Sequence, residues 1–176
     1  NCYVLIDPFS SEPARDAIAE MQVSGNTVGC YISSGTCEVG REDYPQMQDY
    51  CVDTPWEEWP DEYFVDTPND ALIDVMKARI DAMAGWGCEM VEFDNMDWAF
   101  DSETREQYGF AATADDAIAY NRALCDYSQQ QDMGCMAKNM ITTASVVMIL
   151  CFGEPSTVFF RCGGISCATC TSLFIR

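Results

Sequence analysis

The chain has 176 residues, enough for one domain with a substantial core, and its 29 acidic and 9 basic residues give a net charge of -20. The electric field of this net charge repels nucleic acid and anionic membranes and attracts cationic polymers, so we expect neither nucleic acid nor a membrane as a partner. We also expect a monomer. The absence of histidine excludes Ser-His-Asp and Cys-His catalysis and leaves hydrolytic chemistry to carboxylates, without a cofactor.

Strand-like and helix-like patterns alternate along the first 140 residues. The predicted elements, in chain order, are a strand at 3–6, a helix at 13–21, a strand at 27–33, a long acidic loop at 36–62, a short strand at 63–66, a helix from Asn69 or Asp70 to Gly85, a strand at 89–94, a helix from Asp115 or Asp116 to Gln130, and a strand at 135–139.

This alternation predicts a half-barrel or an open parallel sheet, because parallel strands need crossovers that helices usually supply. In such folds the functional site lies at the carboxyl ends of the strands. The polar residues expected at those ends are Asp7, Ser33, Ser34, Asp66, Asp94, Asn95, Asp97, Lys138 and Asn139.

The segment at 91–97, Val-Glu-Phe-Asp-Asn-Met-Asp, is the most informative part of the chain. Side chains on a strand alternate between faces, so Glu92 and Asp94 share one face. Burying two acids is costly, and a fold usually tolerates it where they do chemistry or bind something. Asp94 is expected at the rim, where Lys138 on the following strand would hold it ionised, with Glu92 one layer deeper.

The composition changes after Met140. Residues 141–176 hold one acid, Glu154, and two arginines, together with cysteines at 151, 162, 167 and 170. These cysteines contain a single C-x2-C spacing, which does not favour a zinc site. We therefore predict a folded domain at 1–140 and a divergent cysteine-containing tail at 141–176.

The eleven cysteines predict disulfides and a secreted, extracellular protein. Cys37 and Cys51 bracket the acidic loop and form one candidate pair. Cys88 and Cys135 begin successive predicted strands and form another. The chain starts at Asn1, almost directly in a strand, so we interpret it as a fragment or a processed chain.

Four segments together resemble glycoside hydrolase family 114, the endo-α-1,4-polygalactosaminidases. They are Gly29-Cys-Tyr-Ile-Ser-Ser-Gly35, the 91–97 segment, Ala119-Tyr-Asn-Arg122 and Lys138-Asn139. The resemblance covers residues 1–140 and implies an α/β fold, a partial (β/α)8 TIM-barrel-like parallel barrel without its first and last strands. It further implies hydrolysis of an α-1,4-linked galactosamine polymer by two carboxylates.

The resemblance makes Asp94 the catalytic nucleophile or base. Tyr120 and Asn121 also match a family motif, although their place on a helix favours a packing role. The second catalytic carboxylate is expected after the Lys138-Asn139 strand, where the chain offers only Glu154 in a Gly-Glu-Pro turn. The expected substrate-binding residues are Asp7, Tyr31, Glu38, Asp66, Glu92, Asn95, Asp97, Lys138 and Asn139.

Alternatives remain at several positions. Asp94 or Asp97 could cap a turn, Tyr31 could belong to the core, and Trp56 and Trp59 could pack the loop instead of stacking on sugar. At the level of function, the alternatives are a non-catalytic carbohydrate-binding or structural derivative of the same barrel, and an acidic protein that binds Ca²⁺ through Glu92, Asp94 and Asp97.

Overall fold

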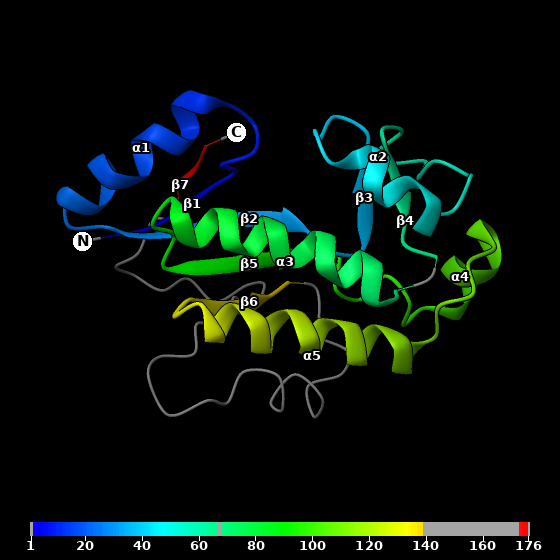
Figure 1. The fold of residues 1–176 in the computed structure, drawn as a ribbon. Coiled ribbons are helices and arrows are strands. Elements are labelled where there is room, and N and C mark those ends of the chain that lie inside the picture. The colour runs from blue at the N-terminus through cyan, green and yellow to red at the C-terminus, as the bar shows by residue number, and fades with distance from the viewer. Residues whose placement is uncertain (1, 67, 139–172, 176) are drawn as a thin grey trace.

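A parallel β-sheet organises the chain (Figure 1). The computed structural model describes residues 2–66, 68–138 and 173–175. The sheet has five strands in the order β6-β5-β2-β1-β7, and each neighbouring pair is parallel. The strands are β1 (Tyr3–Ile6), β2 (Thr27–Ser33), β5 (Met90–Asp94), β6 (Gly134–Ala137) and β7 (Leu173–Ile175). The predicted parallel α/β architecture is confirmed.

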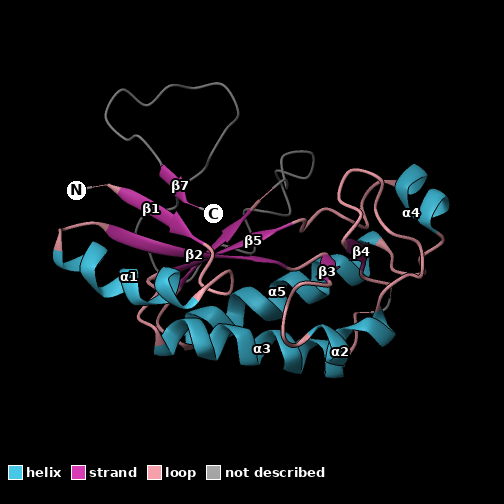
Figure 2. Ribbon diagram, turned by 90° about the horizontal axis from the view of Figure 1, so that it is seen from above, coloured by secondary structure: helices cyan, strands magenta, loops and turns pink. Residues whose placement is uncertain are grey.

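Three long helices lie against one face of the sheet (Figure 2). They are α1 (Glu12–Val23), α3 (Asp70–Gly85) and α5 (Ala114–Gln130). Because side chains alternate along a strand, this face receives one apolar residue in every two. The buried side chains that meet there include Ile6, Val28, Ile32, Val91 and Phe93 from the strands and Ile18, Leu72, Met76, Ile80 and Leu124 from the helices.

The opposite face of the sheet carries polar residues toward the carboxyl ends of β2 and β5. Tyr31 pairs in register with Glu92, and Ser33 pairs with Asp94. Glu92 and Asp94 therefore lie on the same face, while Val91 and Phe93 are fully buried under the helices, as the alternation predicts. This face holds the candidate site.

Helix starts follow local capping chemistry. The Asn69 side chain accepts a hydrogen bond from the Leu72 backbone N–H, which confirms Asn69 as the cap of α3. Helix α5 begins earlier than predicted, because Thr113 is its cap and Asp116 returns the bond in a capping box. A short helix that we did not predict, α4 (Ser102–Tyr108), follows its own cap, Asp101.

The segment between β2 and α3, residues 34–66, departs from the prediction, and we call it the excursion. The predicted strand at 63–66 is replaced by β4 (Glu62–Phe64), which pairs antiparallel with β3 (Thr36–Glu38) in a separate two-stranded sheet. The prediction that it joins the parallel series is therefore wrong. The strand that pairs with β4 is β3, which follows β2 almost directly in the chain. β4 therefore pairs with a segment close to it in sequence and does not cross over to join the parallel sheet. Between β3 and β4 lie α2 (Tyr44–Met47) and η1 (Gln48–Tyr50).

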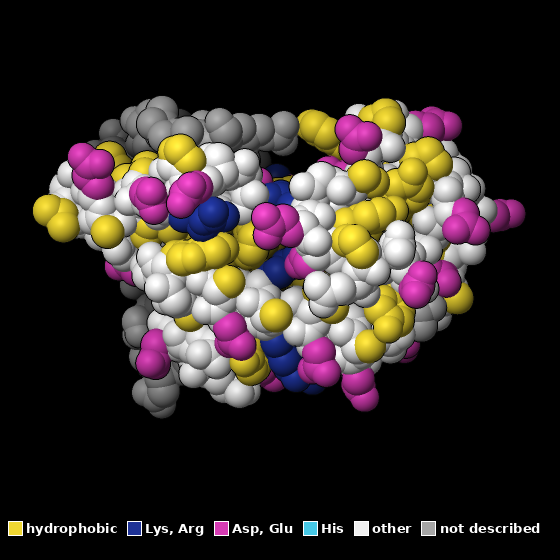
Figure 3. Space-filling model, turned by 45° about the horizontal axis from the view of Figure 1, so that its top comes forward, with side chains coloured by type: hydrophobic (Ala, Val, Ile, Leu, Met, Phe, Trp, Pro, Cys, Tyr) yellow, Lys and Arg dark blue, Asp and Glu magenta, His cyan; other side chains and the backbone are white. Residues whose placement is uncertain are grey.

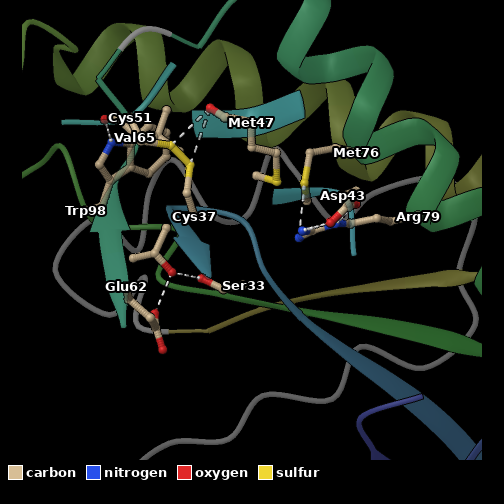
Figure 4. The surroundings of a disulfide bond; sticks show 11 residues. Ser33, Cys37, Asp43, Met47, Cys51, Glu62, Val65, Met76, Arg79 and Trp98 are labelled. Atoms are coloured by element: carbon tan, nitrogen blue, oxygen red, sulfur yellow. Dashed lines mark hydrogen bonds and ion pairs between the residues drawn. A yellow bond between two sulfur atoms is a disulfide. The ribbon is translucent and has the colours of Figure 1, made fainter. Parts of the chain in front are cut away.

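Three disulfides connect the described residues. Cys37–Cys51 confirms the predicted pair and closes the excursion (Figure 4). The predicted Cys88–Cys135 pair is wrong, because Cys88 joins Cys30 and Cys135 joins Cys125. Cys135 meets the helix that covers its own strand, with a Cα–Cα distance of 5.3 Å, and the order of the strands does not reveal that contact. The tail cysteines lie outside the described residues.

A buried ion pair holds the excursion against α3 (Figure 4). Arg79, with 3% of its side chain exposed, donates from Nε and Nη2 to the two Asp43 carboxylate oxygens at 2.6 and 2.7 Å. Burial alone would raise the pKa of Asp43, but the bonds from Arg79 outweigh it and the pKa is lowered. The pair is bidentate, the strongest arrangement for these groups.

We expect Arg79→Ala to destabilise the fold by about 3 kcal/mol, because it leaves Asp43 partly buried without its partner. Lys77→Ala is the matched control on the same helix, since Lys77 forms an exposed pair with Asp74, and it should cost under about 0.5 kcal/mol. Urea unfolding with intact disulfides measures both. Because the folded pKa of Asp43 is lowered, the stabilisation is present above its ordinary pKa and is lost as the pH falls through the folded value. Equal losses for the two variants would contradict this assignment.

Candidate active site

Asp94 ends β5 and is held by donors from three segments. Tyr31 Oη on β2 and Lys138 Nζ after β6 each donate to Asp94 Oδ2 at 3.0 Å, and the Asn95 backbone N–H donates to Oδ1 at 2.9 Å. The predicted contact between Lys138 and Asp94 is confirmed. These three donors, one of them the Lys138 cation, fix the orientation of the carboxylate.

A tight junction between the ends of β2 and β5 fixes the backbone at Asp94. Asn95 has a φ of +57°, in the left-handed region that few residues other than glycine adopt. Gly35 lies so close that a Cβ on it would approach the Asn95 carbonyl oxygen to 2.0 Å. Ser34 donates to the Asp94 carbonyl oxygen from both its backbone N–H and its hydroxyl, each at 3.0 Å. A larger residue at position 35 would therefore push the two strand ends apart.

A chain of hydrogen bonds runs from this junction into the excursion. Asn95 Nδ2 donates to Ser33 Oγ at 3.0 Å, Ser33 Oγ lies 2.5 Å from Thr36 Oγ1, and Thr36 Oγ1 donates to Glu62 Oε2 at 2.6 Å. Figure 4 labels Ser33 and Glu62, which lie on either side of Thr36 in this chain. The Thr36 proton points to Glu62, so the Ser33 hydroxyl is the donor to Thr36. All three bonds therefore run in one direction and end on Glu62.

Two cavities of about 220 Å³ each lie beside Asp94 and the excursion. They adjoin, because Tyr31, Trp59 and Glu62 line both. The first is also lined by Asp7, Ser10, Glu38 and Arg41. The second is also lined by Trp56, Asp94, Asn95 and Lys138. We call the two together the groove. Acidic side chains are scattered over the face shown in Figure 3, where basic ones are few.

Arg41 neutralises part of the acidic charge in the groove. Its guanidinium binds Glu38 through Nε at 2.9 Å and Nη2 at 2.6 Å, and reaches Asp7 through Nη1 at 2.9 Å. Asp7 and Glu38, both predicted to bind substrate, thus share one cation at the groove wall.

Burial and neighbouring charges shift two further groups. Burial raises the pKa of Glu62, the hydrogen bond from Thr36 opposes this, and the charges of Glu38 and Asp94 raise it further. Burial, followed by the charge of Asp94, raises the pKa of the Tyr31 phenol well above its ordinary value. Tyr31 therefore remains a neutral donor to Asp94.

The aromatic residues of the excursion divide into two roles. Trp56 packs on Phe64 with ring centroids 4.9 Å apart and also lines the second cavity. Trp59 is 44% exposed and lines both cavities. Trp56 thus serves packing to a large extent, whereas Trp59 contributes a partly exposed side chain to both cavities.

Three other predicted residues do not line these two cavities. Glu92 is 9% exposed on the same face as Asp94. The Asp66 carboxylate accepts a hydrogen bond from the Ala111 backbone N–H at 2.6 Å. Burial raises the pKa of Asp97, and the charge of Asp94 adds to this. Asn139 lies outside the described residues.

Tyr120 and Asn121 are buried on α5 and support the chain that follows β5. Asn121 Nδ2 donates to the Met96 carbonyl oxygen at 2.7 Å, and the Tyr120 ring meets Trp98 edge-on. Their motif match therefore reflects packing, as their helical position suggested.

Sequence reasoning did not single out Glu62, Arg41 or Thr36. Glu62 stands in an acid-rich loop with no periodic pattern, so only the β3–β4 pairing shows that it faces the groove. Among the described residues, no group of three or more His, Cys, Asp or Glu side chains could hold a metal ion, so Glu92, Asp94 and Asp97 are not such a group. Within the same part of the chain, no helix is long and apolar enough to cross a membrane.

Among the solved structures similar to the chain, two bear on its family. The complex of Aspergillus fumigatus Ega3 with galactosamine matches at a TM-score of 0.71 and 22% identity, over 85% of this chain and 64% of that one. The glycoside hydrolase domain of PelA from Pseudomonas aeruginosa matches at 0.53 and 12%, over 77% and 51%. The chain thus spans less than two thirds of either structure, and at these identities the likeness shows the fold. No curated protein matches the chain.

The family model described as glycoside-hydrolase family GH114 matches residues 3–153. This match runs past residue 140, where we predicted that the tail begins, and that boundary stays a prediction. Because the match covers most of the chain and the described sheet has the fold expected of a partial barrel, the chain belongs to glycoside hydrolase family GH114.

Proposed function

We propose that this protein hydrolyses a galactosamine-containing polysaccharide, as an endo-α-1,4-polygalactosaminidase does, with Asp94 as the nucleophile or base. The observation that carries the proposal is the geometry of Asp94, an oriented carboxylate at the end of a central parallel strand that faces a groove. Family membership supports the reaction class.

Hydrolysis adds water across the glycosidic bond. The bond from the anomeric carbon to the bridging oxygen breaks, the water oxygen ends on that carbon, and the bridging oxygen leaves with a proton. Asp94 would either attack the anomeric carbon directly or take the proton of the attacking water. A second carboxyl group would protonate the leaving oxygen, and we expect it after the Lys138-Asn139 strand.

The substrate is proposed to be a cationic polymer with free amino groups. A chain with a net charge of -20 attracts such a polymer, and acids line much of the groove. A solved complex of the similar protein Ega3 contains galactosamine, which supports an amino sugar as the unit recognised. The three disulfides support a secreted protein, since such bonds persist in oxidising compartments.

A non-catalytic carbohydrate-binding or structural protein is the second candidate. The observation that favours it is the scarcity of acids in residues 141–176, where Glu154, in the sequence Gly-Glu-Pro, is the one acid. Binding of galactosamine oligomers without release of reducing ends would support this candidate over the enzyme.

We expect Asp94→Asn to lower the release of reducing ends from galactosamine oligomers by about 1,000-fold or more, because the amide can act neither as nucleophile nor as base. Asp16→Asn, the same change at an exposed position of α1, should leave the rate unaltered. If Asp94→Asn cleaved at the parent rate while remaining folded, Asp94 would not be the catalytic carboxylate.

We expect Trp59→Ala to raise the KM for galactosamine oligomers about tenfold with a small change in kcat, since an exposed ring in the groove can stack on the apolar face of a sugar. Val39→Ala is the matched control, because Val39 lies in the same excursion and is also 44% exposed. Steady-state kinetics on both variants give the answer, and a loss confined to kcat would speak against stacking.

A further inference from the structure

Glu62 differs from the other carboxylates that line the groove. Asp7 and Glu38 share Arg41, and Asp94 pairs with Lys138. Glu62 makes no ion pair with any residue that the structure describes, although it lines both cavities. Asp7 and Glu38 share a single positive charge, but among the acids that line the groove Glu62 alone has no described cation paired directly with its carboxylate.

The orientation of Glu62 is set before any ligand arrives. Its backbone pairs with Glu38 in the β3–β4 sheet, and Oε2 accepts the hydrogen bond that ends the chain from Asn95. No described residue donates to the other oxygen, Oε1. A carboxylate held at one oxygen, with the second available, can accept a charge-assisted bond from a ligand at little entropic cost.

We propose that the Glu62 carboxylate binds the ammonium group of the sugar unit that lies in the groove next to Trp59, and so selects free amino sugars over N-acetylated ones. This proposal rests on the proposed function, because it specifies how the same groove recognises its substrate. N-acetylation removes the positive charge and replaces a three-donor ammonium group with an amide that has one N–H. A site built around an unbalanced carboxylate discriminates against that change.

The electrostatic setting of Glu62 agrees with this role. The charged and titratable groups that act on it are Glu38 on β3, Asp94 on β5, Arg41 in the excursion and Tyr31 on β2. Burial and the two acids raise the pKa of Glu62 against the opposing effects of Thr36 and Arg41. A bound ammonium group relieves the repulsion, so its binding should favour loss of a proton from Glu62. Affinity should therefore fall as the pH drops through the pKa of Glu62, which lies above its ordinary value.

The test compares Glu62→Gln with the parent chain on two matched probes, a galactosamine oligomer and the N-acetylgalactosamine oligomer of equal length. Glutamine keeps the shape, and its amide oxygen can still accept the bond from Thr36, so the change removes the charge and replaces the free acceptor Oε1 with an NH2 donor. We expect roughly tenfold weaker binding of the galactosamine oligomer by calorimetry, with binding of the acetylated oligomer unchanged. The acid-side fall in affinity should also disappear. Glu58→Gln, the same change at an exposed position of the excursion, should alter neither probe.

The outcomes separate this inference from the proposed function. If the parent chain binds and cleaves neither oligomer, the proposed function fails and this inference falls with it. If the parent chain prefers the galactosamine oligomer and Glu62→Gln retains that preference, the inference alone is overturned. An equal loss on both probes would also overturn it, because that would assign Glu62 to the shape of the groove and not to recognition of the amine.

Discussion

The central constraint is that a carboxylate with little exposure at the end of a central strand must be held by partners, because desolvating an unpaired charge is costly. Asp94 satisfies it with Tyr31, Lys138 and the Asn95 backbone. Parallel strands end at one edge of the sheet, so residues distant in sequence reach the same carboxylate. The partners that stabilise the Asp94 carboxylate therefore also hold it in one orientation, facing the groove.

The groove depends on the excursion as much as on the sheet. Trp59 and Glu62 belong to a segment that is tied down by the Cys37–Cys51 disulfide and the Arg79–Asp43 ion pair. None of the residues of the disulfide or the ion pair lines the groove. Their contribution to the site is therefore to hold the β3–β4 sheet in position.

The acidic surplus is distributed unevenly in the groove. Arg41 offsets one of the two negative charges of Asp7 and Glu38, Lys138 pairs with Asp94, and Tyr31 stays a neutral donor. Glu62 keeps its charge without a cation among the described residues, in a setting where burial and two other acids raise its pKa. The groove as a whole thus suits a cationic ligand with an apolar face. The negative charge of the whole protein would attract such a ligand, and Glu62 offers it a carboxylate without a paired cation.

The sequence by itself determined the local features. Alternation along 91–94 placed Glu92 with Asp94 and buried Val91 with Phe93, the cap at Asn69 began a helix, and the order of strands brought Lys138 to Asp94. Only the tertiary structure decided the antiparallel pairing of β3 with β4, the disulfide partners of Cys88 and Cys135, and the place of Glu62 in the groove. The reason is that periodicity and capping act within a few neighbouring residues, whereas these contacts join segments that no repeating pattern relates. Short strands and lone acids in an irregular loop acquire their partners only when the chain has packed around them.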